Sequence, residues 1–268
     1  MRGEFAILFS AILMGTISIF VRNTSSDPFF VAFLRLFFAT VFLSPFALLA
    51  KENFRIGKPL IALATFNLLT IVSYINAIQN IEAGTAALLL YTAPIYVLIF
   101  AIIQGERIEE RTLISLPLGF SGLYLMLSPY AELNLGLISG IISGISYAIV
   151  FVLTKKVKDV SPFQVTFFNV FFGSLLLLPY SILNFTDFPI FWAIGLGLIP
   201  TAIPFTLFIY GVRSVKLQNA PIIALIEPFF AVLVGFSYFG EILSTTQILG
   251  GIMILSATSI VLWNKTTS

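Results

Sequence analysis

Two charged residues stand inside apolar stretches of this sequence, where either could do chemistry. Glu227 lies within Leu217–Glu241, directly before Pro228 and about 12 Å into an apolar helix at ~1.5 Å per residue. A bilayer core is about 30 Å thick, so the carboxylate falls near its middle, where burial costs at least a few kcal/mol and marks a functional candidate. Pro228 removes a helical hydrogen bond and kinks the helix. A charge beside a broken backbone ladder predicts a site lined by water or a bound solute.

Arg35 is the second charge within an apolar segment, roughly 10 Å from the nearer membrane face. One interpretation makes it an anchor for a substrate carboxylate or a gated partner of Glu227. The other makes it half of a structural ion pair that locks two helices together. The two charges differ in depth by about 8 Å, so direct contact needs the long arginine side chain, or a bridging water or ligand.

Other side chains are candidates for the same site because they are polar or aromatic and lie at similar depth. Each is also compatible with simple packing or with a place at the lipid interface. The candidates for substrate binding or coupling are Asn169, Tyr74, Asn76, Tyr91, Tyr147 and Tyr210. Pro94 and Pro228 occupy equivalent places in two apolar segments, and we expect paired kinks beside the cavity.

The elements that must position these residues are apolar helices. Of the 268 residues 59% are hydrophobic and 10% charged, whereas a soluble domain has about 25% charged residues. The pattern predicts an all-α integral membrane protein of ten transmembrane helices, with connections too short for a soluble domain. The expected helices cover 4–21, 29–50, 59–80, 84–104, 112–128, 134–154, 162–183, 189–212, 218–239 and 245–263.

Lysine and arginine orient the chain. With both termini in the cytoplasm, twelve of these residues fall at the cytoplasmic face and Arg22 alone in an outer loop, a strong positive-inside bias. The twelve are Arg2, Lys51, Arg55, Lys58, Arg107, Arg111, Lys155, Lys156, Lys158, Arg213, Lys216 and Lys265. We therefore expect a multi-pass protein of the plasma membrane.

The chain also repeats itself. A shift of 134 residues places Pro28 on Pro162, and it gives identity at eight of nineteen positions over Pro28–Phe46. Arg35 then corresponds to Asn169, and Pro94 to Pro228. Each repeat holds five helices, an odd number, so the second must be inverted in the membrane. We expect repeats at 1–130 and 131–268, with a substrate site between them near the midplane, as in alternating-access transporters.

Several classes of function lack their usual residues. The sequence has no cysteine and no histidine, so it predicts no metal site, no thiol chemistry and no serine–histidine hydrolase. It has no Walker P-loop either. We expect no enzyme activity, no cofactor and no nucleic-acid partner. The spacing of Gly136, Gly140 and Gly144 predicts close helix contact, within one protomer or between two.

Three motifs carry a family resemblance that covers essentially the whole chain. They are FLRLFFATVFLSP, AGTAALLLYTAPIYVLIFAIIQGE, and NAPIIALIEPFFAVLVGFSYFGEILSTTQILGGIMIL. The chain resembles the drug/metabolite transporter superfamily, EamA type, with the family's arginine at Arg35 and its Glu-Pro at Glu227-Pro228. It departs from the family where Met14 and Tyr147 replace frequent tryptophans, so an aromatic-stacking role is not carried over.

The resemblance implies a carrier that exports small metabolites such as amino acids through a central cavity between two five-helix halves. The cavity lacks an obvious lysine cluster for phosphate, which favours a zwitterionic or amphipathic solute. The alternatives are a channel-like pore or a structural subunit of a membrane complex. No ring of like charges or filter loop indicates a channel, and a structural subunit would not need an acid at the midplane. The expected partners are the bilayer and a small-molecule substrate, for a monomer or homodimer.

Overall fold

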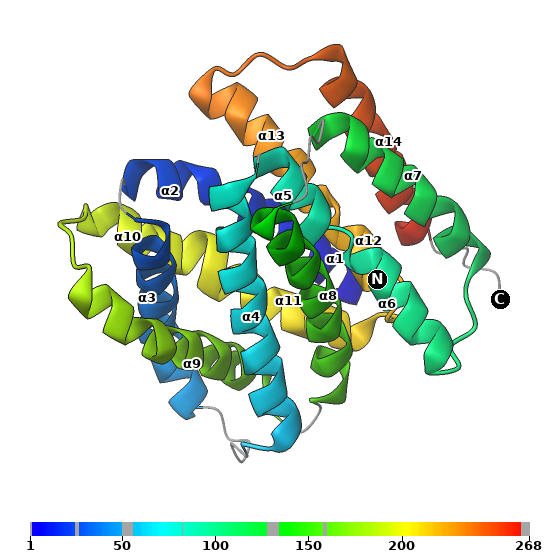
Figure 1. The fold of residues 1–268 in the computed structure, drawn as a ribbon. Coiled ribbons are helices and arrows are strands. Elements are labelled where there is room, and N and C mark those ends of the chain that lie inside the picture. Colours follow the sequence, from blue (N-terminus) through cyan, green and yellow to red (C-terminus); the bar gives the residue numbers. More distant parts are fainter. Residues whose placement is uncertain are drawn as a thin grey trace.

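The structure is a computed structural model, and it describes residues 2–24, 27–49, 56–81, 83–127, 134–157 and 160–263. Across those residues the regular structure is entirely helical, in agreement with the predicted all-α fold (Figure 1). Four of the cytoplasmic cations expected above, Lys51, Arg55, Lys158 and Lys265, lie outside these ranges, as does the predicted repeat boundary at 130/131.

The helices follow the predicted spans to within a few residues. The first half contains α1 (Arg2–Gly15), α2 (Ile17–Thr24), α3 (Pro28–Leu49), α4 (Lys58–Asn80), α5 (Ala83–Leu90), α6 (Ala93–Ile103) and α7 (Glu110–Leu127). The second half contains α8 (Leu135–Lys156), α9 (Pro162–Leu183), α10 (Ile190–Gly197), the π-helical turn η1 (Leu198–Ala202), α11 (Ile203–Ser214), α12 (Ala220–Ala224), α13 (Ile226–Phe239) and α14 (Thr245–Leu262).

In the described part of the chain, nine helical spans are long and apolar enough to cross a membrane. The tenth expected span is α7, which has the same 18-residue length as α14 but carries Glu110 and Arg111 in its first turn. Figure 1 shows α7 and α14 running side by side at one edge of the bundle, where they pack extensively. The prediction of an all-α membrane protein with two repeats of five helices is confirmed.

Two spans are broken at repeat-equivalent positions. The fourth span divides into α5 and α6 around Tyr91, and the ninth divides into α12 and α13 at Leu225, 134 residues later. Each break lies three residues before a proline, Pro94 or Pro228, whose missing N–H leaves a carbonyl of the preceding turn without its helical donor. Backbone groups freed in this way need other partners, which places both breaks beside polar space.

The ends of these two broken spans also match. A glycine in the left-handed conformation follows each helix: Gly105, with φ 77°, comes two residues after the end of α6, and Gly240, with φ 69°, directly follows α13. Only glycine adopts this conformation without steric cost, and it closes a helix C-terminus. A glutamate follows each glycine, Glu106 and Glu241, so the sequence match between the repeats is also a match of backbone geometry.

The two halves interleave. The main helix interfaces join one half to the other: α3 packs on α9, α4 on α8, α1 on α11, and α7 on α14. In the five-helix numbering of each repeat, α1 with α11 and α8 with α4 are the same pair of helices exchanged between halves. An arrangement of this kind relates the halves by a two-fold pseudo-symmetry and places their shared space at the centre.

The glycines of α8 serve packing within the chain. A Cβ on Gly140 would lie 2.4 Å from the Leu89 side chain, and one on Gly144 would lie 2.3 Å from the Leu89 carbonyl oxygen. A Cβ on Gly136 would lie 2.7 Å from Asn80. Of the two possibilities left by the sequence, contact within one protomer is therefore the one that these glycines make.

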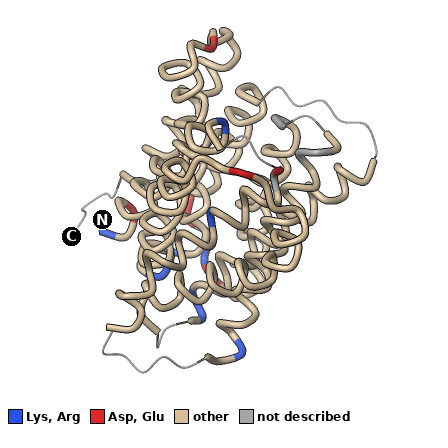
Figure 2. Tube along the Cα trace, turned by 90° about the vertical axis from the view of Figure 1, so that its left-hand side faces the viewer, with Lys and Arg blue, Asp and Glu red and all other residues tan. Residues whose placement is uncertain are grey.

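The two ends of the bundle differ in packing. The largest apolar cluster fills one end, where residues such as Leu63, Val97, Phe151 and Val212 are buried. We call this the closed end; it carries the segments 107–112 and 213–219. The opposite, open end carries Arg22 and Glu241. Figure 2 shows how sparse the charges are along the helices, and most of the blue segments lie in its lower half.

Candidate functional site

A cavity of about 630 Å³ lies between the two halves. Its lining includes Arg35 and Glu227 in the interior and continues to Arg22 and Glu241 at the open end. It stops at the apolar cluster of the closed end. A volume of this size suits a small organic molecule rather than a bare ion.

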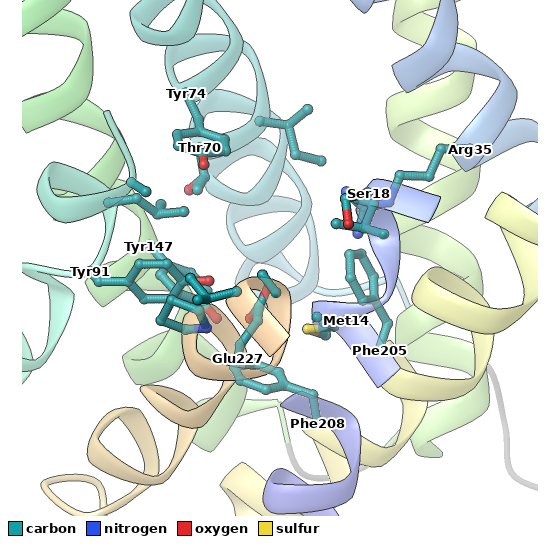
Figure 3. Close-up of a pocket in the computed structure, with 18 of the residues that line it drawn as sticks. Met14, Ser18, Arg35, Thr70, Tyr74, Tyr91, Tyr147, Phe205, Phe208 and Glu227 are labelled. Atoms are coloured by element: carbon teal, nitrogen blue, oxygen red, sulfur yellow. The ribbon is translucent and has the colours of Figure 1, made fainter. Parts of the chain in front are cut away.

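The break in the ninth span positions the acid. Because α13 begins at Ile226, Glu227 lies in its first helical turn, where the partial positive charge of a helix N-terminus favours a carboxylate. The side chain is half-buried and faces the cavity (Figure 3). Tyr91, at the equivalent break of the first repeat, lines the same cavity as this carboxylate. The two breaks thus bring an acid and a phenol together.

Arg35 reaches the cavity from α3 and is held by the π-helical turn of the second half. Its Nε donates to Thr201 Oγ1 at 2.9 Å, and its Nη2 donates to the Pro200 carbonyl at 3.3 Å. Its guanidinium carbon lies 5.2 Å from the centre of the Phe205 ring. All these partners are neutral. Within the described chain no acid lies within 4.0 Å of Arg35, so the ion pair with Glu227 that the sequence allowed is not formed.

Six of the eight predicted binding residues line the cavity, including Tyr91. The other five are Glu227, Arg35, Asn169, Tyr74 and Tyr147. Asn169, the repeat counterpart of Arg35, is buried, and its Oδ1 has no hydrogen-bond partner among the described residues. Pro228 also lines the cavity, while Pro94 is buried in the first turn of α6.

Two of the predicted residues do not line the cavity. Asn76 accepts a hydrogen bond from Ser139 Oγ at 2.9 Å, which ties α4 to α8. Tyr210 is 43% exposed on the outer surface of α11. The rotation of side chains around the helix explains why both residues lie outside the cavity. Asn76, for example, is two residues after Tyr74, a rotation of about 200° around the helix, so the two cannot face the same space.

Sequence reasoning did not identify several residues of the lining. Ser18, Thr70 and Phe205 all contribute to it, and Figure 3 shows Ser18 with Arg35 across the cavity from Tyr91 and Tyr147. The Ser18 hydroxyl is buried without a partner in the described structure. Small hydroxyl residues and phenylalanines are frequent throughout this chain, so nothing in their types set these three apart. The one signal in the sequence was the pair of prolines Pro200 and Pro204, which mark the segment that contacts Arg35.

The open end of the cavity carries an ion pair. Arg22 Nη1 lies 2.7 Å from Glu241 Oε1, and the Arg22 guanidinium lies 4.2 Å from the centre of the Phe239 ring. Both charged side chains are about half exposed. An exposed pair of this kind contributes little stability, and here it leaves the cavity mouth polar.

The closed end is tied across the two halves by polar contacts around Glu109. Its carboxylate accepts hydrogen bonds from Arg111, from Lys216 and from Asn219 Nδ2 at 3.1 Å. Burial raises the pKa of Glu109, but the hydrogen bonds from Arg111, Lys216 and Asn219 outweigh it and lower the pKa to about 2. Gln218 adds two contacts, accepting from the Glu109 N–H and donating to the Arg107 carbonyl, each at 2.9 Å. We call this set the Glu109 cluster.

Comparison with known proteins agrees with the fold. The model of the EamA-like transporter family matches twice, over residues 1–128 and 134–263. An "Uncharacterized transporter" of Archaeoglobus fulgidus is 54% identical over 264 residues, which are 98% of this chain and 97% of that protein. An "S-adenosylmethionine uptake transporter" of Rickettsia prowazekii is 23% identical, covering 92% of this chain and 86% of its own.

A solved crystal structure has the same fold, with a TM-score of 0.85 at 15% identity over 97% of this chain and 98% of its own. The double family match, the similarity along the full length and the ten-helix bundle around a central cavity all agree. The chain is a multi-pass membrane protein and belongs to the EamA-like transporter family.

Proposed function

We propose that the protein is a secondary transporter that exports small metabolites such as amino acids by alternating access through the central cavity. One observation carries this proposal: the cavity holds a cation and an acid that are not paired with each other. A buried charge in a membrane protein is costly unless it is neutralised. A solute that carries both charges would neutralise Arg35 and Glu227 together, and it would be held by two ends at once.

The chemistry of the lining supports a zwitterion with an apolar or aromatic body. Arg35 suits a carboxylate, Glu227 suits an ammonium or other cation, and aromatic side chains such as Tyr74, Tyr147 and Phe205 lie between or beside them. A free amino acid meets this description. S-adenosylmethionine, which the name of the Rickettsia relative mentions, also carries an α-carboxylate and positive charges, and it is the first larger solute to test.

The difference between the two ends supports alternating access. The cavity reaches the open end, while the apolar cluster and the Glu109 cluster block the closed end. We assign the closed end to the cytoplasm because Lys58, Arg107, Lys155 and Lys216 gather there. Transport then requires the interface between the repeats, 1–130 and 131–268, to open at the closed end and to close at the open end.

The experiment starts from purified protein and a thermal-shift screen of amino acids, nucleosides, cationic drugs and S-adenosylmethionine. Solutes that stabilise the protein are then tested in proteoliposomes for exchange and for gradient-driven accumulation. Glu227→Gln keeps the size and hydrogen-bonding capacity of the side chain and removes its charge. Glu110→Gln, at the bundle end and outside the cavity, is the matched control.

The two variants separate the roles open to Glu227. If the acid binds the cationic group of the solute, Glu227→Gln abolishes exchange and weakens binding at every pH. If it couples transport to protons, exchange survives and accumulation is lost. Kinetics equal to those of Glu110→Gln in both assays would show that Glu227 takes no part, and would refute the proposed site.

A further inference from the structure

The way in which Arg35 is held carries an inference that rests on the proposed function and specifies how its anionic end is recognised. The span that holds it contains two prolines four residues apart, Pro200 and Pro204, around the π-helical turn η1. In an α-helix each carbonyl accepts from the N–H four residues later. Proline has no N–H, so Pro200 leaves the Leu196 carbonyl, and Pro204 leaves the Pro200 carbonyl, without that donor.

Both of these carbonyls have found side-chain donors. Thr201 Oγ1 donates to the Leu196 carbonyl at 2.7 Å. The same hydroxyl oxygen accepts from Arg35 Nε at 2.9 Å, and the Pro200 carbonyl accepts from Arg35 Nη2 at 3.3 Å. Thr201 is fully buried, so this geometry is shielded from water. The prolines leave two carbonyl acceptors free. Thr201 occupies the Leu196 carbonyl and also accepts from Arg35, while Arg35 itself occupies the Pro200 carbonyl.

The Arg35 guanidinium has N–H groups left to donate to a ligand. Arginine has five N–H donors, and two of them are used by Thr201 and Pro200. Among the described residues, the other three have no hydrogen-bond partner, and the group lines the cavity. Ser18 lines the same cavity, on the same side as Arg35 in Figure 3, with its buried hydroxyl unpartnered in the described structure.

We propose that Pro200, Thr201 and Pro204 are positioning residues that hold Arg35 as the anion-binding group of the cavity, and that Ser18 completes a subsite for a carboxylate. The carboxylate accepts from the free N–H groups of Arg35 and from the Ser18 hydroxyl. A planar guanidinium matches a carboxylate with two parallel hydrogen bonds. Phosphate is disfavoured because Arg22, the other cation among the described residues of the lining, is paired with Glu241, and because Glu227 shares the cavity.

The test reads Arg35 directly and needs no transported solute. Phenylglyoxal reacts with the guanidinium of arginine, and mass spectrometry of the purified full-length protein reports the rate at the peptide that contains Arg35. Thr201→Val keeps the shape of threonine and removes the acceptor for Nε, so the rate is expected to rise about fivefold, the effect of one hydrogen bond. Thr201→Ser keeps the hydroxyl and is expected to react at the parent rate.

A second variant covers the case in which Thr201→Val does not fold, as judged by size-exclusion chromatography. Pro204→Ala supplies an N–H that competes for the Pro200 carbonyl, and it is expected to raise the rate in the same direction. Equal rates in the parent and in every folded variant would show that the π-helical turn does not position Arg35, and would overturn that part of the proposal.

Protection against labelling tests the ligand. Sodium benzoate, an aromatic carboxylate, is expected to slow the labelling of Arg35 in the parent protein and to lose most of this effect in Ser18→Ala. Protection by inorganic phosphate but not by benzoate would overturn the assignment to a carboxylate. Protection by neither would overturn the anion subsite. Since labelling does not depend on transport, these results stand whether or not the solutes of the screen are carried.

Discussion

Glu109 offers a direct test of whether the closed end opens. Replacing it with glutamine removes the charge that Arg111 and Lys216 share, and leaves one oxygen for Asn219. A fall of the pKa from its ordinary 4.5 to about 2 corresponds to about 3 kcal/mol between the two protonation states. Lys216 is 61% exposed, so water screens part of this interaction, and about 1–2 kcal/mol remains.

This free energy should act on the conformational equilibrium. If the Glu109 cluster forms only while the closed end is shut, Glu109→Gln raises the open population by roughly five- to thirtyfold, because 1.4 kcal/mol is a factor of ten. The natural chain has no cysteine, so a single Ala101→Cys is a clean reporter. Ala101 is fully buried in the apolar cluster of the closed end, and a thiol there reacts only after opening.

The assay is the rate of labelling by a membrane-impermeant maleimide in inside-out vesicles. We expect the Ala101→Cys protein to label several times faster with Glu109→Gln than without it. Glu110→Gln is the control, because Glu110 makes no ion pair within the described residues. Equal rates in all three proteins would refute the reasoning, since the Glu109 cluster would then not hold the closed end shut.

Three further predictions concern Glu109, Gly144 and Arg22. The pKa of Glu109 is lowered in the folded protein, so its stabilisation is complete above about pH 4.5 and lost as pH falls toward 2; thermal unfolding should separate parent from Glu109→Gln at pH 7 and much less at pH 3. Gly144→Ala should lower the melting temperature clearly, by overpacking worth about 1–3 kcal/mol, because its Cβ meets the Leu89 carbonyl. Arg22→Gln should cost at most about 1 kcal/mol in a denaturation series, since its pair with Glu241 is half exposed.

Much of the fold could be predicted because the membrane imposes a simple code. A helix must satisfy its own backbone in lipid, so apolar length gives the spans, and the broken fourth and ninth spans coincide with Pro94 and Pro228. The sequence repeat predicted which helices of the two halves correspond. Gly105 and Gly240, which the repeat matches, have the same left-handed φ. These features are local in sequence or repeated in it, and they need no knowledge of packing.

The site could be predicted only in part. Glu227 and Arg35 were found because charges are rare in lipid. The sequence did not predict that these two residues form no ion pair. The partners of Arg35 are a hydroxyl and a carbonyl 165 residues or more away, at a π-helical turn that no periodicity indicated. Tyrosines are common at lipid interfaces as well as in cavities, and only helix rotation separates Tyr147 from Tyr210.

The contact of Gly144 with the Leu89 carbonyl has a mechanical consequence. It brings α8 against the backbone at the junction of α5 and α6, and a contact to backbone cannot be relieved by a change of rotamer. Tyr147 lies one turn after Gly144, and Tyr91 lies two residues after Leu89. The two tyrosines should therefore move together as one rigid unit when the repeats move. A change in how the cavity holds a solute must then come from displacement of α13, which carries Glu227, or of α3, which carries Arg35, relative to these tyrosines.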